Sequence, residues 1–196
     1  MSNIVYNASP TLQKFHADDD FVRMLMGPFG SGKSVGCIAE IMSRAARMPV
    51  QRSGKRTSRW VVGRNSYREL TDTTLRTAED WIPQHWRRWT ASDMRMDVTF
   101  QDVHLELLFR ALDRPDDIKK LLSLELTGAF INESREVPKA VFDAIQGRVG
   151  RFPRKGGGGW FGIICDTNPP DTDHWIYRVF EEDRPDGYKV YHQPSG

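Results

Sequence analysis

Short apolar runs alternate along this chain with longer segments in which apolar residues recur every three or four positions. The apolar runs predict buried strands at 21–26, 59–63, 128–132, 160–168 and 188–192. The periodic segments predict helices at 34–48, 66–82, 115–122, 138–149 and 173–181. Strands that alternate with helices in this way are typical of an α/β fold, in which helices flank a mostly parallel central sheet.

Two segments depart from that alternation. Residues 94–100 and 103–109 each alternate apolar with polar side chains on either side of Gln101-Asp102, which predicts a β-hairpin. A run of glycines follows Lys155, and this composition predicts a mobile loop at 155–159.

Length and composition narrow the class of protein. The chain has 196 residues, so we expect one domain spanning positions 1–196. Hydrophobic residues make up 39% and charged residues 28%, a composition typical of soluble globular proteins. No apolar run approaches the roughly 18 residues of a membrane span, and the first residues lack the shape of a signal peptide, so we expect no membrane partner.

The net charge and the cysteine content say less about the function of this protein. The net charge of +2 is too small to indicate a nucleic-acid partner by itself. Cys37 and Cys165 both lie in apolar stretches, so we expect reduced, buried thiols rather than a disulfide. The histidines and cysteines show no spacing typical of a zinc site.

The sequence GPFGSGKS at 27–34 fits the phosphate-binding P-loop pattern G-x-x-x-x-G-K-S/T and lies between a predicted strand and a predicted helix. Backbone N–H groups of such a loop surround phosphate oxygens, and the helix N-terminus adds partial positive charge. Lys33 would reach the β- and γ-phosphates of ATP, and Ser34 would bind Mg²⁺. A glycine-rich turn without function is the alternative. The predicted loop comprises Gly27, Pro28, Phe29, Gly30, Ser31, Gly32, Lys33 and Ser34.

Asn132-Glu133 follows the predicted strand at 128–132, where a P-loop ATPase is expected to carry Asp-Glu. Glu133 would orient or deprotonate the attacking water, as a catalytic residue near the metal. Asn132 would offer an oxygen to the Mg²⁺ shell without the charge, and so hold the metal less tightly. The structural alternative is a helix that begins here, with Asn132 as its cap.

CDTNPP at 165–170 follows the next predicted strand along the chain. Parallel strands present their carboxyl ends to a ligand, so Thr167 and Asn168 would contact the γ-phosphate. The order N-P-P-D also has the Asn and Asp spacing of a guanine-recognition loop, but its lysine is missing, which disfavours GTP. We expect any adenine-binding residues upstream of the P-loop, near Gln13 and Phe15.

Basic residues gather in two segments without acids, 44–59 and 146–155. Such clusters can hold a phosphate backbone, although a run of charge is often only a solvated loop. DNA contact is one hypothesis for 44–59; for 146–155, DNA, a neighbouring subunit and no partner stay open. The tryptophans of 81–89 are expected in the core or an interface rather than as platforms for bases.

Several motifs together resemble the ATPase domain of the large terminase subunit of tailed bacteriophages. The resemblance covers roughly residues 21–180, and its specific part is the combination of LTGAFINESREVP, GRVGRFP and DTNPP. The P-loop alone is generic. The other matching motifs are GRNSYREL and FRALDRPDDIKKL.

The resemblance implies a P-loop ATPase of the ASCE type. It further implies ATP and Mg²⁺ as cofactors, and translocation of double-stranded viral DNA into a procapsid by a homo-oligomeric ring. The implied partners are the portal protein and a small terminase subunit, and the implied location is the bacterial host cytoplasm, transiently at the portal. The family normally carries a C-terminal nuclease as well, and because no region matching it is seen here, we expect the chain to correspond to the motor domain, which by itself can be monomeric.

This sequence departs from the family pattern at the third P-loop position, where Phe29 replaces an arginine. A charge-stabilising arginine must then come from elsewhere in the chain or from a neighbouring subunit. We rank Arg148 first as this catalytic arginine. The further candidates, in order, are Arg110, Arg151 and Arg64.

Three other functions stay open at this point: a helicase-like ATPase without a packaging role, a small-molecule P-loop kinase, and a nucleotide-binding assembly subunit without turnover. No lid typical of the kinases is evident in the sequence. Asn132 is the residue that makes the last of the three conceivable.

Overall fold

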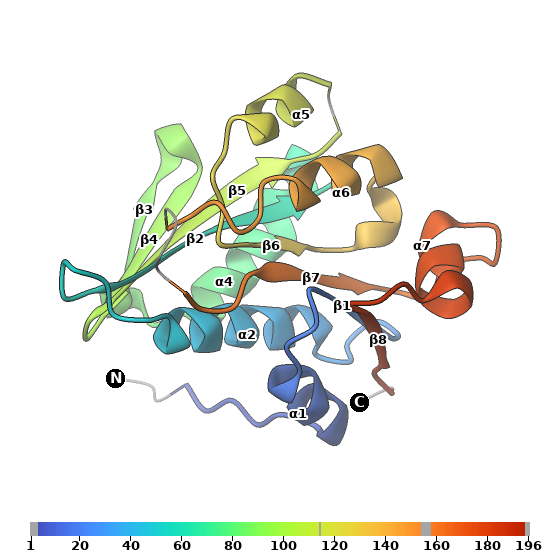
Figure 1. Ribbon diagram of the computed structural model, residues 1–196, viewed down its shortest axis with the longest axis horizontal. Coiled ribbons are helices and arrows are strands. Elements are labelled where there is room, and N and C mark those ends of the chain that lie inside the picture. Colours follow the sequence, from blue (N-terminus) through green and yellow to red (C-terminus); the bar gives the residue numbers. More distant parts are fainter. Residues whose placement is uncertain (1–3, 114, 154–157, 195–196) are drawn as a thin grey trace.

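The computed structural model describes residues 4–113, 115–153 and 158–194, and within these ranges it forms one central sheet between two layers of helices (Figure 1). The strands follow the order β3-β4-β5-β2-β6-β7-β1-β8 across the sheet. Their bounds are β1 Val22–Met26, β2 Arg56–Arg64, β3 Arg87–Thr90, β4 Arg95–Phe100, β5 Val103–Ala111, β6 Gly128–Ile131, β7 Gly162–Thr167 and β8 Tyr188–His192.

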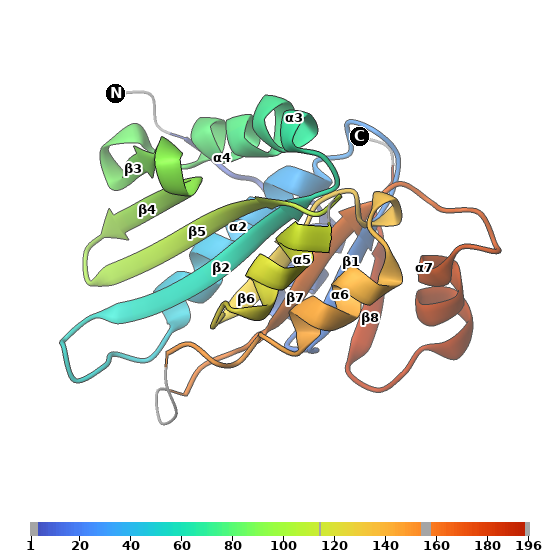
Figure 2. The same ribbon diagram turned by 90° about the horizontal axis from the view of Figure 1, so that it is seen from above.

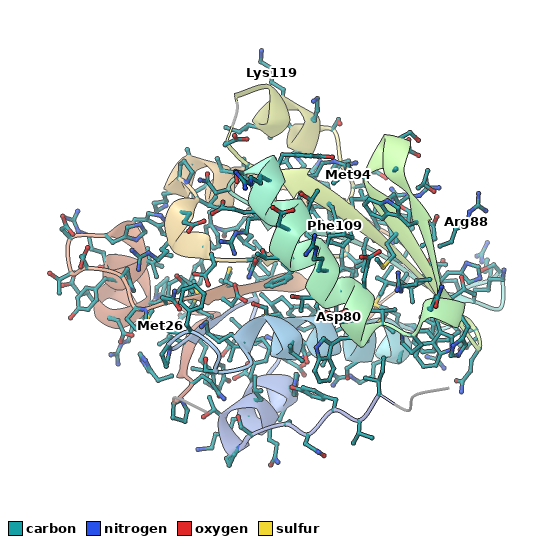
Figure 3. The ribbon with its side chains drawn as sticks, turned by 180° about the vertical axis from the view of Figure 1, so that it is seen from behind. Met26, Asp80, Arg88, Met94, Phe109 and Lys119 are labelled. Carbon is teal, nitrogen blue, oxygen red and sulfur yellow. The ribbon has the colours of Figure 1, made fainter. Side chains whose placement is uncertain are left out.

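The sheet is mostly parallel, as the sequence predicts. From β5 through β2, β6, β7 and β1 to β8, every neighbouring pair of described strands runs parallel. β3 and β4 add antiparallel pairs at the other edge, where the predicted hairpin continues the sheet. Figure 3 shows Met26 at the end of β1 and Arg88 on β3 on opposite sides of the molecule.

Helices cover both faces of the sheet, so that the central strands are buried on both sides (Figures 1 and 2). One face packs against α1, α2 and α4, and the other against α5, α6 and α7. The α-helices are α1 Pro10–Ala17, α2 Lys33–Arg47, α3 Tyr67–Glu69, α4 Arg76–Trp81, α5 Pro115–Leu122, α6 Lys139–Gln146 and α7 Trp175–Tyr177. The π-helical segments are η1 Leu70–Leu75 and η5 Arg178–Asp183, and the 3₁₀ turns are η2 Gln84–Trp86, η3 Ala91–Asp93 and η4 Ser134–Glu136.

The helix predicted at 66–82 is continuous from α3 to α4, but its middle, Leu70–Leu75, is π-helical. The helix predicted at 138–149 ends earlier, at Gln146, and the chain then runs back beside the amino end of β6. The sequence analysis missed α1, whose start is marked by Ser9, an N-cap that accepts a hydrogen bond from the Leu12 backbone. Most of the loop predicted at 155–159 lies outside the described residues.

The tryptophans and cysteines lie where the sequence predicts. Trp60 is completely buried and stacks on Trp160, with 5.9 Å between ring centroids. The tryptophans of 81–89 pack against the core on the α2 face. Cys37 and Cys165 are free, buried thiols, and burial raises the pKa of both.

A buried cluster of charges joins α1, β1 and α2. The Glu40 carboxylate accepts a hydrogen bond from Arg44 Nε at 2.6 Å and is paired with Arg23 Nη2 at 2.8 Å. His16 Nδ1 lies 2.7 Å from its other oxygen. Burial alone would raise the pKa of Glu40, but the His16 hydrogen bond and the two guanidinium groups outweigh it and lower that pKa to about 2.

Glu40→Gln is expected to destabilise the fold by about 3–5 kcal/mol at neutral pH, because it leaves the buried Arg23 guanidinium uncompensated. The Glu40 contribution is complete above the ordinary carboxyl pKa of 4.5 and is lost as the pH falls toward about 2. The free energies of unfolding of wild type and variant, measured in urea across this range, should therefore converge at acid pH.

The control is Asp143→Asn, which removes an exposed carboxylate paired with Lys139 and should change stability by less than about 0.5 kcal/mol. A stability gap between wild type and Glu40→Gln that stays constant down to acid pH would contradict the role given to Glu40.

Candidate nucleotide-binding site

The P-loop joins β1 to α2 at the carboxyl edge of the parallel strands, as the sequence predicts. Gly30 and Gly32 have φ values of 73° and 79°, a left-handed conformation that favours glycine. Gly27 is required for a different reason: a Cβ there would lie 2.3 Å from the backbone oxygen of Gln193. The loop therefore opens onto the N-terminus of a helix of 15 residues, an arrangement suited to phosphate oxygens.

Gln193 holds the loop from the end of β8, a contact that no motif in the sequence indicates. Its backbone N–H donates to Met26 O at 2.7 Å, and its side-chain Nε2 donates to Ser31 O at 3.1 Å. Ser9 Oγ in turn donates to Gln193 Oε1 at 3.1 Å. Because these segments are far apart in the sequence, the contact is visible only in the fold.

Lys33 lies inside the loop, with 5% of its surface exposed. Its Nζ donates to Gly27 O and Pro28 O at 2.8 Å each, and to Asn168 Oδ1 at 3.2 Å. The structure thus brings the loop lysine and Asn168 together, as predicted for a residue next to the terminal phosphate. Thr167, the other residue predicted there, is fully buried, and its hydroxyl donates to Asn168 O.

Asp166, which the sequence analysis did not assign to the site, is the buried acid at its centre. Its Oδ2 accepts from Ser34 Oγ at 2.6 Å, and its two oxygens lie 2.8 and 2.9 Å from Asn132 Nδ2. The backbone N–H of Glu133 donates to Oδ1 at 2.7 Å. The signal was present in the sequence, since Asp166 stands at the end of an apolar run one strand away from Asn132-Glu133.

The Asn132 amide is oriented by partners on both of its sides. Its Oδ1 accepts from Arg64 Nη1 at 2.8 Å and from Thr74 Oγ1 at 2.7 Å. Its Nδ2 points to Asp166 and to Ser34 Oγ, at 3.1 Å from the latter. The expectation that Asn132 offers its oxygen to the metal shell is therefore corrected: the oxygen is engaged by Arg64 and Thr74, and the amide N–H₂ faces the corner occupied by Ser34.

Glu133 is the N-cap of the 3₁₀ turn η4, with φ 49° and ψ 55°, a strained backbone for a residue other than glycine. The alternative in which Asn132 caps a helix is not what forms, because the turn begins at Ser134 and the Asn132 side chain bonds elsewhere. Glu133 is 9% exposed and lines the cavity above the P-loop. Its backbone conformation holds the carboxylate at the mouth of the loop while its N–H stays on Asp166.

Burial dominates the electrostatics of Asp166. Complete burial raises its pKa, and hydrogen bonds from Ser34 and the Glu133 backbone oppose that rise, so that the pKa settles at about 6. Its hydrogen-bond partners are a hydroxyl, an amide and a backbone N–H rather than a cation. These hydrogen bonds keep the Asp166 carboxylate ordered. Because its partners are neutral, they leave its negative charge uncompensated, and the carboxylate can still attract a cation.

A cavity of about 380 Å³ lies over the P-loop. Thr73 and Thr77 on the helical segment opposite also line it, and neither was anticipated from the sequence. Phe29, where the family pattern has arginine, is 86% exposed at its rim. The cavity is lined by Phe29, Gly30, Ser31, Gly32, Lys33, Ser34, Val35, Arg64, Thr73, Thr77, Asn132 and Glu133.

Of the arginines considered from the sequence, Arg64 lines this cavity, and its Nη2 lies 3.5 Å from Glu136. Arg148 does not reach it: its backbone oxygen accepts from Leu126 N at the amino end of β6, the opposite edge of the sheet. Arg151 lies in the same segment, and Arg110 bonds to carbonyls near η3. Within one chain, the structure brings Arg64 to the P-loop and leaves the other three elsewhere.

The upstream residues considered for adenine give no open platform. Phe15 is completely buried, with the Arg23 guanidinium over its ring and Tyr191 at its edge. Gln13 donates to Ala8 O on the surface of α1. Phe15 therefore has no face free for a base.

The donor set at the loop suits Mg²⁺, which prefers hard oxygen ligands and keeps several waters. The Ser34 hydroxyl and the Asp166 and Glu133 carboxylates converge at this corner. In the described part of the chain, no group of three or more histidine, cysteine and acidic side chains is arranged to hold a metal ion. The oxygen donors present fit a Mg²⁺ ion that would be held by Ser34 together with water and phosphate oxygens.

Comparison with protein families gives one model, described as phage terminase large subunit, which matches residues 19–195. A search of curated proteins gives no match. No helix in the described residues is long and apolar enough to cross a membrane.

Solved structures of similar fold include the large terminase of a thermophilic bacteriophage, with a TM-score of 0.75 and 12% identity over 97% of this chain. The large terminase ATPase domain of Thermus phage P74-26 matches with a TM-score of 0.62 and 16% identity over 95% of this chain and 81% of its own. The large terminase of bacteriophage HK97 has a TM-score of 0.66 and 15% identity over 95% of this chain. This chain spans 46% of the first of these proteins and 39% of the last.

Gly27→Ala is expected to destabilise the fold by about 1–3 kcal/mol, because the new methyl group would collide with the Gln193 backbone. The measurement is urea unfolding. Gly147→Ala is the matched control, since its Cβ would meet nothing closer than 3.6 Å, and it should leave stability unchanged or raise it by up to about 1 kcal/mol. Equal stability of the two variants would mean that Gln193 does not press on the loop.

Proposed function

The chain belongs to the family of phage terminase large subunits, and we propose on that premise that it hydrolyses ATP to drive double-stranded DNA into a viral procapsid. One observation supports the hydrolysis most directly: Lys33, Ser34 and Glu133 line one cavity at the carboxyl ends of parallel strands. Structures of the thermophilic phage's large terminase in complex with ADP and with ATP-gamma-S support an adenine nucleotide as the ligand.

The role proposed for each residue of the site follows from its hydrogen bonds and its position in the cavity. Lys33 exchanges the carbonyls of Gly27 and Pro28 for β- and γ-phosphate oxygens, while Asn168 stays beside it to contact the terminal phosphate. Glu133 orients the attacking water and accepts its proton. Ser34 would hold a Mg²⁺ ion, which when bound would supply positive charge to neutralise the phosphates. Backbone N–H groups of residues 29–34 bind phosphate oxygens at the N-terminus of α2.

Two sources of arginine are consistent with this geometry. Arg64 acts within the same subunit, from its place on the Asn132 oxygen at the cavity wall. Arg148 can reach a nucleotide only from a neighbouring subunit, because it lies at the amino end of β6, away from the P-loop of its own chain. We propose Arg148 as the arginine contributed across an interface in a homo-oligomeric ring, and Arg64 as the residue that receives the nucleotide's charge in cis.

DNA is proposed to bind at the edge of the molecule opposite the P-loop, where α2 ends and β2 begins (Figure 1). Some of the basic side chains of 44–59 are closely paired with acids: Arg44 with Glu40, Arg56 with Asp102 and Arg59 with Glu106. Exposed basic side chains remain at this edge, and Gly159 packs closely against Met48 and Pro49 there. The described exposed members are Arg47, Arg52, Lys55 and Arg151.

The proposed function also implies which partners the protein has and where it acts. The partners are the portal protein and a small terminase subunit, and the place is the bacterial host cytoplasm, at the procapsid portal during packaging. A helicase-like ATPase that uses the same site without packaging is the alternative. Packaging of DNA into procapsids separates the two.

Glu133→Gln is expected to lower the release of phosphate from ATP at least about 100-fold while nucleotide affinity stays within a few-fold, because it removes the base and keeps the shape. Lys33→Ala should lose both binding and turnover. Glu182→Gln, which removes an exposed acid that does not line the cavity, is the control and should behave as wild type. Full turnover in either site variant would exclude the proposed ATPase.

An equal mixture of Lys33→Ala and Arg148→Ala proteins should regain about a quarter of wild-type turnover, because random pairing leaves that share of interfaces with both residues intact. The measurement is phosphate release at concentrations where wild-type turnover rises faster than linearly with protein. Wild-type turnover by Arg148→Ala alone, or no gain on mixing, would count against Arg148 and leave Arg64 as the arginine in cis.

A further inference from the structure

We propose that Asp166 supplies the carboxylate that Asn132 lacks, so that the acid serving the Mg²⁺ corner stands on β7 instead of β6. The inference rests on the proposed ATPase function and deepens it. Asp166 acts as a positioning residue: it fixes the Ser34 hydroxyl and does not itself contact the phosphates.

Strand register explains how an acid on β7 reaches this corner. Ile131 of β6 is opposite Cys165 of β7, so the next residues, Asn132 and Asp166, stand side by side at the ends of their strands. Asp166 is also in register with Leu25 of β1, just before the P-loop. Because β7 lies between β6 and β1, its carboxylate is one strand nearer to the phosphate-binding loop than a side chain at 132.

The contact between Asp166 and Ser34 explains how the carboxylate can orient the hydroxyl group that would bind the metal ion. A hydroxyl that ligates a cation does so through a lone pair, and its proton must then point to another acceptor. Asp166 Oδ2, at 2.6 Å from Ser34 Oγ, is that acceptor. The acid is fully buried, so the hydroxyl is held in this orientation without competition from bulk water.

The pairing also explains why an amide stands at 132. Asn132 Nδ2 donates toward both oxygens of Asp166, and its Oδ1 is occupied by Arg64 and Thr74. An aspartate at 132 would place a second carboxylate within about 3 Å of Asp166, where like charges cannot both stay ionised. Restoring the usual acid at 132 should therefore impair the site rather than improve it.

A purely structural role is the competing account, since Asp166 also accepts the Glu133 backbone N–H at 2.7 Å. The two accounts differ in what they predict for Asp166→Asn, because that variant keeps a side-chain oxygen able to accept the Glu133 backbone N–H. A purely structural role therefore predicts an unchanged effect of Mg²⁺ on binding, whereas a carboxylate needed for the metal corner predicts loss of that effect and its return when Asn132→Asp is added.

The test compares wild type, Asp166→Asn, Asn132→Asp and the exchanged double variant. The primary readout is the affinity for a fluorescent ATP analogue with Mg²⁺ and with EDTA, and phosphate release is secondary. In EDTA, the affinity of Asp166→Asn for the ATP analogue is expected to lie within about twofold of that of wild type. The Mg²⁺ gain, meaning the ratio of the affinity with Mg²⁺ to that with EDTA, is expected to fall at least about tenfold in this variant. Asn132→Asp alone should also lose most of that gain, and the double variant should recover it to within about threefold of wild type.

Thermal unfolding is measured beside binding, so that a failure to fold is recognised. If Asp166→Asn does not fold, the double variant decides. A double variant that recovers the Mg²⁺ gain supports the inference, and a double variant that folds but lacks the Mg²⁺ gain overturns the inference. An unchanged Mg²⁺ gain in folded Asp166→Asn likewise overturns it. If wild type itself binds no nucleotide, the proposed function fails, an outcome distinct from failure of the inference alone.

Discussion

A buried carboxylate shared between three chain segments holds the nucleotide site together. Asp166 accepts hydrogen bonds from the first turn of α2, from the residue that follows β6 and from the backbone of Glu133. Ser34, Asn132 and Glu133 are therefore placed relative to one another by a single side chain. Because that side chain is fully buried, its partners cannot be replaced by water, and the geometry of the whole corner depends on it.

Two fully buried acids of the described chain, Glu40 and Asp166, are compensated in opposite ways. Glu40 is surrounded by guanidinium groups and an imidazole, and its pKa is lowered to about 2. Asp166 is held by neutral donors, and its pKa is raised to about 6. In the first arrangement the charge of Glu40 is compensated by its neighbours, and these contacts hold α1, β1 and α2 together. The second leaves a negative charge that a cation would stabilise further, which is the property expected of a binding site rather than of a structural pair.

Local pattern was enough to predict the P-loop, the hairpin and all the described strands except β3, because periodicity and short motifs act within a few residues. It was not enough for Asp166, Gln193 or Thr74, whose contacts span β7, β8 and η1 and depend on strand order. The same limit explains Arg148: the sequence showed an arginine in a matching motif, and the direction of β6 decides at which edge it lies. The π-helical middle of 66–82 also escaped, since its apolar spacing resembles that of an α-helix.

That π-helical segment makes the site sensitive to helical register. An α-helix advances about 100° per residue, so removing the extra residue of a π turn would rotate the remainder of the helix by about that angle. Thr74, inside the segment, would then leave Asn132, and Thr77 beyond it would turn away from the cavity. The hydrogen bond from Thr74 to the Asn132 amide oxygen, and with it this wall of the cavity, therefore depends on the π-helical winding of residues 70–75.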